Sequence, residues 1–311
     1  DQIVTQGFTI TRSIQSAPWP AATANLEYAA VWGTFASPSE DTAREADGIR
    51  VRRISTLLEA EGRNSSHPKQ LTANSGIGFI GNYVLGRGFV LDADEAKEWI
   101  RMNERNREVL FPYLNGEDLN SRPDCSPSRW VIDFNDRSEE AAATFPEPFS
   151  RVLELVRPQR MKASKAVSEA NWWQHFRCRP NMRHAIADLD EVLVIALVSK
   201  TVLPMRVPTG QVFSHRLAVF ATDSFADQAS LSSSMHQMWA IKYSSTLETR
   251  VNYSPSDAFV TFPRPEATEE LEVAGASLHS ARREIMLRRN LGLTKLYNLV
   301  NDPEVGGDPD V

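Results

Sequence analysis

The sequence predicts a mixed α/β (α+β) protein. Short runs rich in β-branched and aromatic residues alternate with segments whose apolar residues recur at helical spacing. With 311 residues, 41% of them hydrophobic and 24% charged, the chain is long enough to bury the cores of two compact units. No internal repeat of fixed period is visible, which argues against a solenoid or propeller.

The N-terminal segment predicts two strands and a short helix. GFTITRSI and LEYAAVWGTF have strand composition and are separated by a loop around Pro18 and Pro20. IRVRRISTLLEAEG, residues 49–62, carries apolar residues at spacings that suggest a short helix. Residues 62–78 are rich in Gly, Ser and Asn, so we expect a loop and a domain boundary there.

The middle of the chain predicts further strands and helices. YVLGRGFVLD is expected to form a strand pair or a bent strand. In the helix that follows, Asp92 has the spacing from Glu95 that is typical of a capping box. SRWVIDF is expected to be a strand, and residues 149–174 a mainly helical segment interrupted at Pro158.

The C-terminal half predicts three strands followed by helices. The strands are VLVIALVS, MRVP and GQVFSHRLAVFAT. In the last of them, Phe213, His215, Leu217 and Val219 share a mostly apolar face, which predicts that Arg216 projects outward. Helices are expected at residues 226–243 and 269–289.

Helical spacing groups apolar residues of the 226–243 segment. Leu231, Met235, Met238 and Trp239 recur at this spacing, together with Lys242. We expect the sulfur and aromatic side chains to belong to a core and not to a cofactor site.

The motifs that would carry catalysis or cofactor binding are absent or out of context. GIGFIG, residues 76–81, has the letters of a dinucleotide fingerprint, but no strand-like run precedes it and strand-like sequence follows it. A glycine-rich turn is the alternative that we prefer. Glu117 and Asp118 are adjacent, which in an extended segment points them apart. A local role, bonding turn backbone together with Asn115, Asn120 and Ser121, is expected instead. We therefore predict no catalytic and no cofactor-binding residue in this chain.

Cysteine and histidine usage predicts neither disulfides nor a metal site. The two cysteines, Cys125 and Cys178, are expected to be buried, reduced thiols. His175, His184, His215 and His236 are scattered without the spacing of metal ligands.

Charge is distributed unevenly along the chain. The formal net charge is −6, yet residues 151–216 hold eleven Lys or Arg against five Asp or Glu. This segment could form a local basic face suited to nucleic acid, or a solvated helix of mixed charge.

Six runs, in order, resemble the C-terminal part of MmeI-like restriction-modification adenine DNA methyltransferases. The most specific is EVLFPYLNGEDLNSRPDCSPSRWVIDF, residues 108–134. The others are LTANSGIGFIGNYVLGRGFVLDADEA, NWWQHFRCRP, VPTGQVFSHRLAVFA, SSSMHQMWAIKYSSTLETRVNYSPSDAFVTFPRP and RREIMLRRNLGLTKLYNLVNDPE. Together they extend over most of the chain.

The resemblance implies a parent enzyme that transfers a methyl group from S-adenosylmethionine to the adenine amino group in duplex DNA. Such an enzyme extrudes its target base. In the family, the cofactor motif and the N-P-P-Y motif precede the part matched here, and this sequence contains neither N-P-P nor D-P-P. The partners implied are double-stranded DNA and a missing N-terminal catalytic part of the same polypeptide, and S-adenosylmethionine is expected only in the full-length parent.

The resemblance also implies a domain organisation. Residues 1–36 would be the closing strands of a class I methyltransferase sheet and 37–79 a linker. Residues 80–265 would form the DNA target recognition domain, and 266–311 the start of a C-terminal helical segment.

Ten polar side chains are candidates for DNA contact. Arg and Lys suit guanine or phosphate, and the hydroxyl groups suit either bases or phosphates. The candidates are Arg177, Arg179, Lys200, His215, Arg216, Lys242, Ser244, Ser245, Arg250 and Tyr253. Trp172 and Trp173 could stack on DNA, but we expect them to close the edge of a core. The family is more basic before this tryptophan pair than MKASKAVSEAN is, which weakens phosphate binding there.

Two other interpretations stay open. The chain could be a separate, non-catalytic DNA-binding specificity subunit, or a structural protein from a decayed gene. The first residue is Asp1 and not Met, which favours a fragment of a longer polypeptide.

Overall fold

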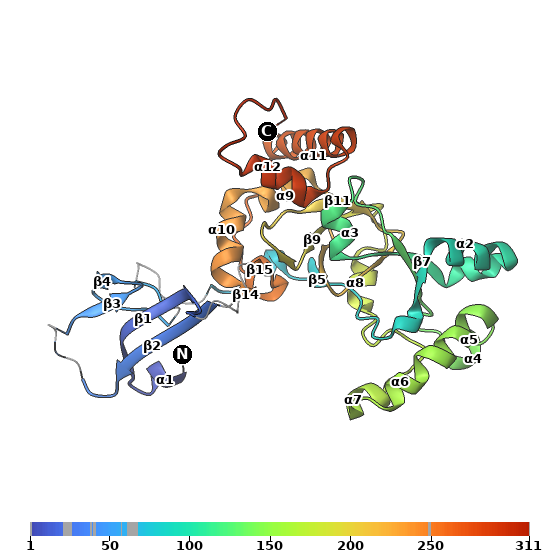
Figure 1. Ribbon diagram of the computed structural model, residues 1–311, viewed down its shortest axis with the longest axis horizontal. Coiled ribbons are helices and arrows are strands. Elements are labelled where there is room, and N and C mark those ends of the chain that lie inside the picture. The colour runs from blue at the N-terminus through green and yellow to red at the C-terminus, as the bar shows by residue number, and fades with distance from the viewer. Residues whose placement is uncertain are drawn as a thin grey trace. The chain divides into compact units, whose positions relative to one another are not determined.

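The computed structural model describes residues 2–20, 27–37, 39, 42–56, 58–60, 68–247 and 250–310. The chain divides into two compact units, Asp1–Lys69 with Leu247–Thr249, and Gln70–Thr246 with Arg250–Val311. The described part is mixed α/β, with four small sheets and a helical C-terminal region (Figure 1). None of the described helices is both long and apolar enough to cross a membrane.

The first unit is built on one sheet of order β2-β1-β3-β4, preceded by α1 (Gln2–Thr5). Its strands are β1 (Thr9–Pro18), β2 (Glu27–Thr34), β3 (Arg44–Ala46) and β4 (Ile49–Val51). The two strands expected from the sequence are the antiparallel pair β1 and β2. The helix expected over 49–62 is wrong, because Ile49–Val51 is a strand and Ile54 bridges Ala60. Alternation of Ile49, Arg50 and Val51 has the strand period of two.

The central sheet of the second unit has the order β11-β9-β13-β5 and is antiparallel throughout. Its strands are β5 (Gly78–Ile80), β9 (Glu191–Ala196), β11 (Met205–Pro208) and β13 (Leu217–Phe220). Val192 and Val194 pack into one core, whereas Leu193 and Ile195 pack into another. Because both faces are covered, the strand is a continuous apolar run and does not alternate with polar residues.

Helices cover both faces of this sheet. On one face Met182, Met286 and Leu296 join the core. They come from α8 (Pro180–Ala185), α11 (Glu269–Arg289) and α12 (Leu293–Val300), beside α3 (Gly116–Ser121). The other face carries Leu231, Ala240 and Phe259. These residues belong to α9 (Phe225–Ser232), α10 (Ser234–Tyr243) and the π-helical turn Pro255–Phe259.

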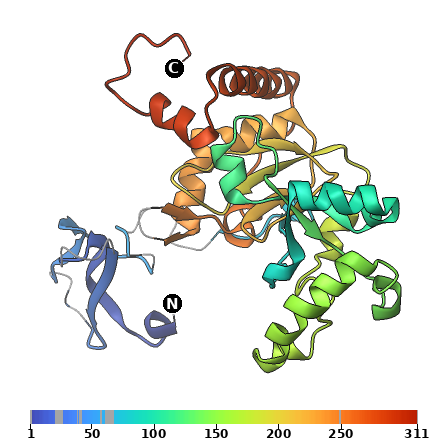
Figure 2. The ribbon, with the colours of Figure 1, turned by 45° about the vertical axis from the view of Figure 1, so that its right-hand side comes forward.

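The long helix α11 lies along α9 (Figure 1 and Figure 2). A Cβ atom on Gly275 would overlap the backbone carbonyl of Phe225, so this close approach requires glycine. Thr268 caps the helix by accepting a hydrogen bond from the Leu271 N–H, and α11 occupies the segment expected from the sequence.

A second sheet of this unit has the order β12-β7-β8-β6. Its strands are β6 (Val90–Asp92), β7 (Leu110–Leu114), β8 (Arg129–Ile132) and β12 (Val212–Phe213). It packs with α2 (Ala93–Met102) and α5 (Pro146–Leu155) around a core that contains Trp172. The Trp173 indole donates to the Arg137 carbonyl oxygen, so the expectation that this tryptophan pair closes a core is confirmed.

Short elements complete the second unit. The α-helical turns are α4 (Glu139–Ala142), α6 (Arg157–Met161) and α7 (Lys165–Ser168), and the 3-10 turns are Thr72–Asn74, Arg87–Phe89 and Glu104–Glu108. A third sheet, of order β10-β15-β14, consists of β10 (Val198–Ser199), β15 (Arg250–Asn252) and β14 (Ser245–Leu247).

The single strand expected over 210–222 is wrong. β12 and β13 belong to different sheets and are separated by a turn at residues 214–216. All of Leu217–Phe220 is buried, so the expected division into one apolar and one outward face does not hold. Arg216 is nevertheless exposed, because it lies in the turn.

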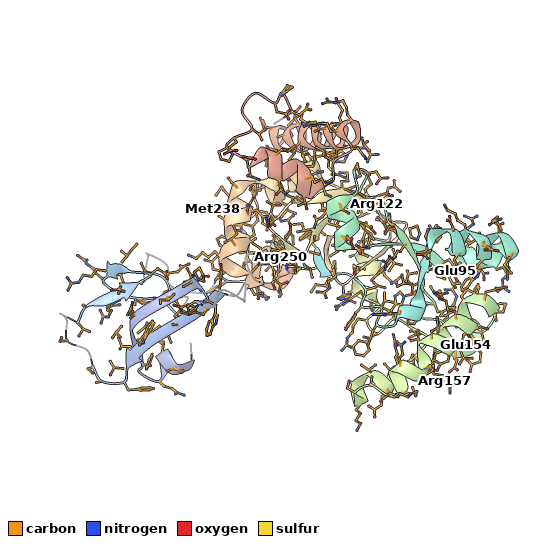
Figure 3. The ribbon with its side chains drawn as sticks, in the orientation of Figure 1. Glu95, Arg122, Glu154, Arg157, Met238 and Arg250 are labelled. Atoms are coloured by element: carbon orange, nitrogen blue, oxygen red, sulfur yellow. The ribbon has the colours of Figure 1, made fainter. Side chains whose placement is uncertain are left out.

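The helix expected over 226–243 is two helices that break at Ser233, whose hydroxyl accepts a hydrogen bond from the His236 N–H. Leu231 is in the core, but Met235 and Met238 are 74% and 70% exposed. The expectation that these methionines are core residues is wrong, because both side chains are exposed on α10, where Figure 3 labels Met238.

The capping box expected at the start of α2 does not form. Asp92 is the N-cap residue but makes no side-chain cap bond. Glu95 instead accepts a hydrogen bond of 2.7 Å from Nη1 of Arg151 on α5. The Glu95 carboxylate, which the sequence pattern assigned to capping the helix, therefore forms a long-range ion pair with Arg151.

Candidate nucleic-acid interface

Several loops meet at one end of the central sheet. Leu217, at the start of β13, pairs with Ala196, where β9 ends. Ile80, at the end of β5, pairs with the neighbouring Ala218. Because neighbouring strands are antiparallel, the segments after β5, after β9 and before β13 emerge together. We call this region the sheet end.

The turn before β13 is held by the segment after β5. The Asn82 N–H donates to the Phe213 carbonyl at 2.7 Å, and the His215 N–H donates to the Asn82 carbonyl at 2.8 Å. A Cβ atom on Gly81 would overlap the Ser214 carbonyl oxygen, so glycine is required at this approach. GIGFIG therefore begins in a turn, where Gly76 has φ 73°, and continues as the edge strand β5, so the expectation of a glycine-rich turn is confirmed only for its first residues.

Basic and aromatic side chains gather around Tyr83. The backbones of Tyr83 and Arg177 exchange two hydrogen bonds of 3.1 Å. The ring of Tyr83 packs against Phe176 and His215, with centroids 5.8 Å and 4.5 Å away. The guanidinium of Arg177 lies 4.6 Å from the Phe176 ring. Arg177, like Arg216, is exposed.

The positive groups of this cluster influence one another. Arg179 is half-buried and its Nε donates to the Gly81 carbonyl at 3.2 Å. Burial and the charge of Arg177 lower the pKa of Arg179. Burial, Arg216 and Arg179 lower the pKa of His215. The guanidinium groups of Arg177, Arg179 and Arg216 create a positive potential here, which an anionic ligand would relieve.

A second group of candidates lies beside the third sheet. The Leu197 N–H donates to the Arg216 carbonyl at 2.9 Å, and the Tyr253 N–H donates to the Leu197 carbonyl at 2.7 Å, which joins the turn to β15. Ser199 pairs with Val251, so the neighbouring Lys200 and Arg250 extend the same register. Lys200 is exposed, and Arg250 lies at the start of β15 (Figure 3).

The remaining candidates differ in exposure. Ser244 accepts a hydrogen bond from the Ser254 N–H, and Ser245 accepts one from the Asn252 amide. Lys242 is exposed at the end of α10. Tyr253 is only 2% exposed, and its hydroxyl donates to Nε2 of His236 at 3.0 Å. Burial raises the pKa of Tyr253. The side chain of Tyr253 therefore lies in the core and is not part of this surface.

The segments of the sheet end contain no acidic residue in the described part of the chain. The segments are residues 81–89, 175–185, 197–204, 213–217 and 242–254. Residues 248 and 249 lie outside the described residues, and one of them, Glu248, is acidic. The whole chain has a formal net charge of −6. The sheet end is therefore a local basic region on an acidic protein.

Sequence reasoning missed Tyr83 and Phe176. The alternation of an aromatic residue with arginines in FRCRP is a signal that could have pointed to Phe176. Tyr83 has no such signal, because its partners Arg177 and His215 are distant in the sequence.

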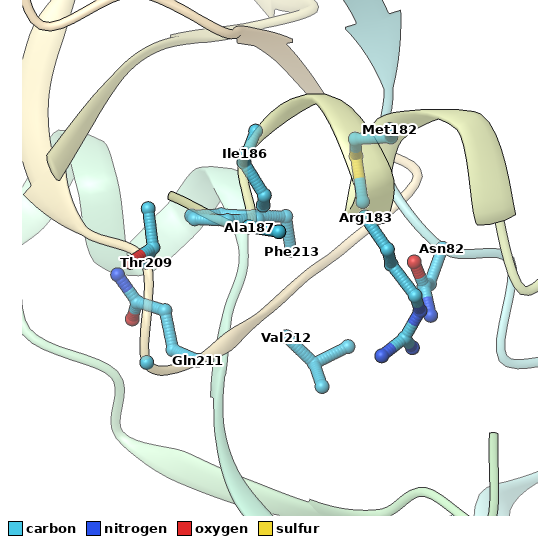
Figure 4. A pocket seen from close by; sticks show the side chains of 10 residues that line it. Asn82, Met182, Arg183, Ile186, Ala187, Thr209, Gln211, Val212 and Phe213 are labelled. Atoms are coloured by element: carbon cyan, nitrogen blue, oxygen red, sulfur yellow. The ribbon is translucent and has the colours of Figure 1, made fainter. Parts of the chain in front are cut away.

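Two cavities adjoin the sheet end. One of about 410 Å³ is lined by Phe79, Ile80 and residues 176–182. The other, of about 230 Å³, has Asn82 and Arg183 on one side and Thr209 and Gln211 on the other (Figure 4). Among the described residues, no group of three or more His, Cys, Asp or Glu could hold a metal ion.

The acidic pair of the most specific sequence run has a local structural role. Glu117 and Asp118 lie in helix α3 and not in an extended segment, and the local role expected for them is confirmed. Their N–H groups donate to the side chain of Asn115, the N-cap residue. Asp118 in turn accepts a hydrogen bond from the Ser128 N–H at 3.0 Å.

Both cysteines are free thiols. Burial raises the pKa of Cys125 to about 12. Cys178 is only half-buried, contrary to expectation, and its thiol donates to the His175 carbonyl.

The family of the chain follows from comparison with known proteins. A family model described as the target recognition domain of MmeI matches residues 65–266, more than half of the chain. This chain belongs to the MmeI target recognition domain family. The match includes every segment of the sheet end, and the resemblance seen in the sequence is confirmed at this level.

The fold of the chain is also similar to that of a solved structure. The structure of the type IIL restriction-modification enzyme MmeI in complex with DNA is similar, with a TM-score of 0.73 and 17% sequence identity. The similarity covers 98% of this chain and 41% of that one, so the chain spans less than half of the enzyme that it matches. At this identity the likeness shows a shared fold. No curated protein matches the sequence.

Proposed function

We propose that this chain is the DNA target recognition portion of a site-specific, adenine-specific DNA methyltransferase of a restriction-modification system, and that the sheet end contacts DNA. The observation that carries the proposal is the sheet end, whose described residues are basic and aromatic and include no acid, on a chain whose net charge is −6. Phosphate binding depends on Lys and Arg, and acidic residues close to the backbone oppose it. Membership of the MmeI target recognition domain family supports the same assignment.

Candidate residues divide by exposure into two roles. Arg177, Arg216 and Lys200 are exposed and can reach phosphates or base edges. Arg179 and His215 are half-buried and are better placed to shape the surface, and the guanidinium of Arg179 adds positive potential. The side chains of Ser244, Ser245 and Arg250 would extend the contact along the third sheet.

The methyl transfer itself is assigned to the parent enzyme. Such a parent would bind S-adenosylmethionine and extrude the target adenine, and its catalytic part would be the partner of this chain. We retain the assignment of residues 1–36 to the closing strands of the catalytic sheet, 37–79 to a linker that also contributes β3 and β4 to the sheet of the first unit, 80–265 to target recognition and 266–311 to a C-terminal helical segment. This chain covers only 41% of the matched enzyme. This coverage supports the proposal that catalysis belongs to another part of the parent enzyme.

The DNA-binding proposal is tested by fluorescence anisotropy. We expect the purified chain to bind a labelled duplex at low salt and to lose affinity steeply as salt rises, because each phosphate contact releases counterions. Absence of binding at low salt, or affinity independent of salt, would contradict the proposal.

The assignment of catalysis to the parent is tested by calorimetry. We expect no appreciable binding of S-adenosylmethionine by this chain, and no methyl transfer to DNA, because the sequence lacks the N-P-P-Y motif. Micromolar affinity for the cofactor would show that the boundary between the catalytic and recognition parts is misplaced.

A further inference from the structure

The loop that carries Arg177, residues 176–179, is held by a buried polar cluster. Its members are Asn82, Asp133, His175 and Arg183. Asp133 follows β8 and is 1% exposed, and His175 is 4% exposed. A carboxylate so deeply buried is costly unless it is paired, so its partners need an explanation.

His175 anchors the beginning of this Arg177 loop. Its Nε2 donates to the Ile132 carbonyl at 2.9 Å, and its Nδ1 accepts a hydrogen bond of 3.1 Å from the Asn82 amide. Nδ1 also lies 3.8 Å from Oδ1 of Asp133. Burial lowers the pKa of His175, which agrees with the neutral ring that these two bonds require.

Arg183 anchors the end of the loop. Its Nε donates to the Cys178 carbonyl at 2.9 Å, and its Nη2 donates to Oδ2 of Asp133. Burial opposes ionisation of Asp133, but the charge and hydrogen bond of Arg183 and the hydrogen bond from the Asn135 N–H favour it, and the pKa of Asp133 lies below its ordinary value. Asp133 is therefore an ionised partner for the Arg183 guanidinium.

The loop adopts a conformation that needs such anchors. Arg179 has φ 54° and ψ 56°, in the left-handed region that residues other than glycine rarely occupy. Such conformations persist where the surrounding structure fixes them. Asn82 also connects the loop to the Arg216 turn, because its backbone carbonyl accepts from the His215 N–H.

We propose that Asp133 is a positioning residue for DNA reading, which fixes the end of the Arg177 loop through Arg183, while the Ile132 carbonyl and the Asn82 amide hold its beginning through His175. This inference rests on the proposed function for its DNA consequence. Its structural part, that Asp133 anchors the loop, stands independently of DNA.

The thiol of Cys178 reports on the loop without any DNA. In Asp133→Asn we expect Cys178 to react with a disulfide reagent about tenfold faster, because local opening becomes easier. The buried Cys125 should keep its slow rate, whereas a loss of global stability would accelerate both thiols. Asp136→Asn is the matched control, since it removes the same charge at an exposed position nearby.

Selection from a pool of duplexes with a randomised centre tests the consequence for DNA. The wild-type chain should enrich a sequence motif, and Asp133→Asn should lose preference at positions in that motif while its affinity for the unselected pool changes less than threefold. Arg183→Lys provides a second variant if Asp133→Asn does not fold. It retains a cation for Asp133 but loses the Nε donor to Cys178.

Each outcome decides a different statement. Unchanged Cys178 reactivity in the folded variants, or an unchanged motif, would overturn the positioning role. A wild-type chain that binds no DNA or enriches no motif would overturn the proposed function, and the DNA consequence with it. The inference would be supported if Cys178 reacted faster while Cys125 kept its rate, and if the variant also lost motif preference.

Discussion

Arg216 is the exposed residue of the turn before β13, and its backbone carbonyl is held by Leu197. We expect Arg216→Ala to relax preference at one base pair, at a cost of about 1–3 kcal/mol of discrimination if the side chain reads a guanine edge. Comparing the motifs that wild type and variant select from randomised duplexes measures this effect.

Other roles of Arg216 would give different results. A phosphate contact would weaken all sequences about equally and lower the salt slope by about one unit. A structural arginine would lower the melting temperature. Arg101→Ala, at an exposed position of α2, is the control for loss of one charge. An unchanged motif would contradict base reading by Arg216.

His236 makes stability depend on pH. Its Nδ1 donates to the Leu231 carbonyl at 2.8 Å, and burial lowers its pKa to about 4. Between pH 6.5, the ordinary pKa of about 6.5 in the unfolded chain, and pH 4, the His236 ring binds a proton in the unfolded chain but stays neutral in the folded chain. The free energy of unfolding is therefore highest above pH 6.5 with respect to this group, and it falls by about 3 kcal/mol as the pH drops to 4.

Chemical denaturation at a series of pH values measures this dependence. His236→Gln should flatten the fall in the free energy of unfolding, whereas His184→Gln, at an exposed position, should not. Equal slopes for wild type and His236→Gln would contradict the assignment.

At the scale of single elements, the contact between the end of β5 and the turn before β13 depends on Gly81. A Cβ atom there would overlap the Ser214 carbonyl oxygen. We expect Gly81→Ala to lower the free energy of unfolding by about 1–3 kcal/mol, because backbone must move to make room. Gly210→Ala is the matched control, since its Cβ would meet no atom within 4 Å. Equal stability of the two variants would show that this approach is not tight.

Helix α10 presents exposed methionines. We expect Met235→Gln and Met238→Gln each to change the free energy of unfolding by less than about 0.5 kcal/mol, because both side chains are exposed. Leu231→Ala, in the core on α9, should cost about 2–5 kcal/mol. Thermal unfolding compares the three, and a large loss in either methionine variant would mean that something covers this face in solution.

The elements that sequence reasoning predicted are those determined locally. The run at 192–196 is continuously apolar and had to be a buried strand, and residues 269–289 follow directly on their own cap residue, Thr268. The break at residues 214–216 was not predictable, because it is imposed by hydrogen bonds to Asn82, far away in the chain. The break at Ser233 had a local signal, a serine able to cap α10, which the helical spacing of apolar residues obscured.

At the scale of the whole molecule, the distribution of charge matters more than its sum. A net charge of −6 would by itself disfavour DNA, yet the second unit gathers basic segments at one sheet end. Sequence reasoning found most of the exposed cations there through the family resemblance. It missed the aromatic contacts, which exist because Tyr83, Phe176 and His215 meet only in the fold.

A charge-reversal comparison tests the central claim, that the sheet end is the DNA-binding surface. Arg177→Glu with Arg216→Glu reverses two exposed charges there, and Lys97→Glu with Arg101→Glu reverses two exposed charges on α2. Each pair changes the net charge equally, so long-range repulsion is matched.

Anisotropy with one labelled duplex at low salt measures both double variants against wild type. We predict that the sheet-end pair weakens binding by about 100-fold or more, whereas the α2 pair weakens it by less than about fivefold. Equal weakening by the two pairs, or stronger weakening by the α2 pair, would contradict the claim that DNA binds at the sheet end.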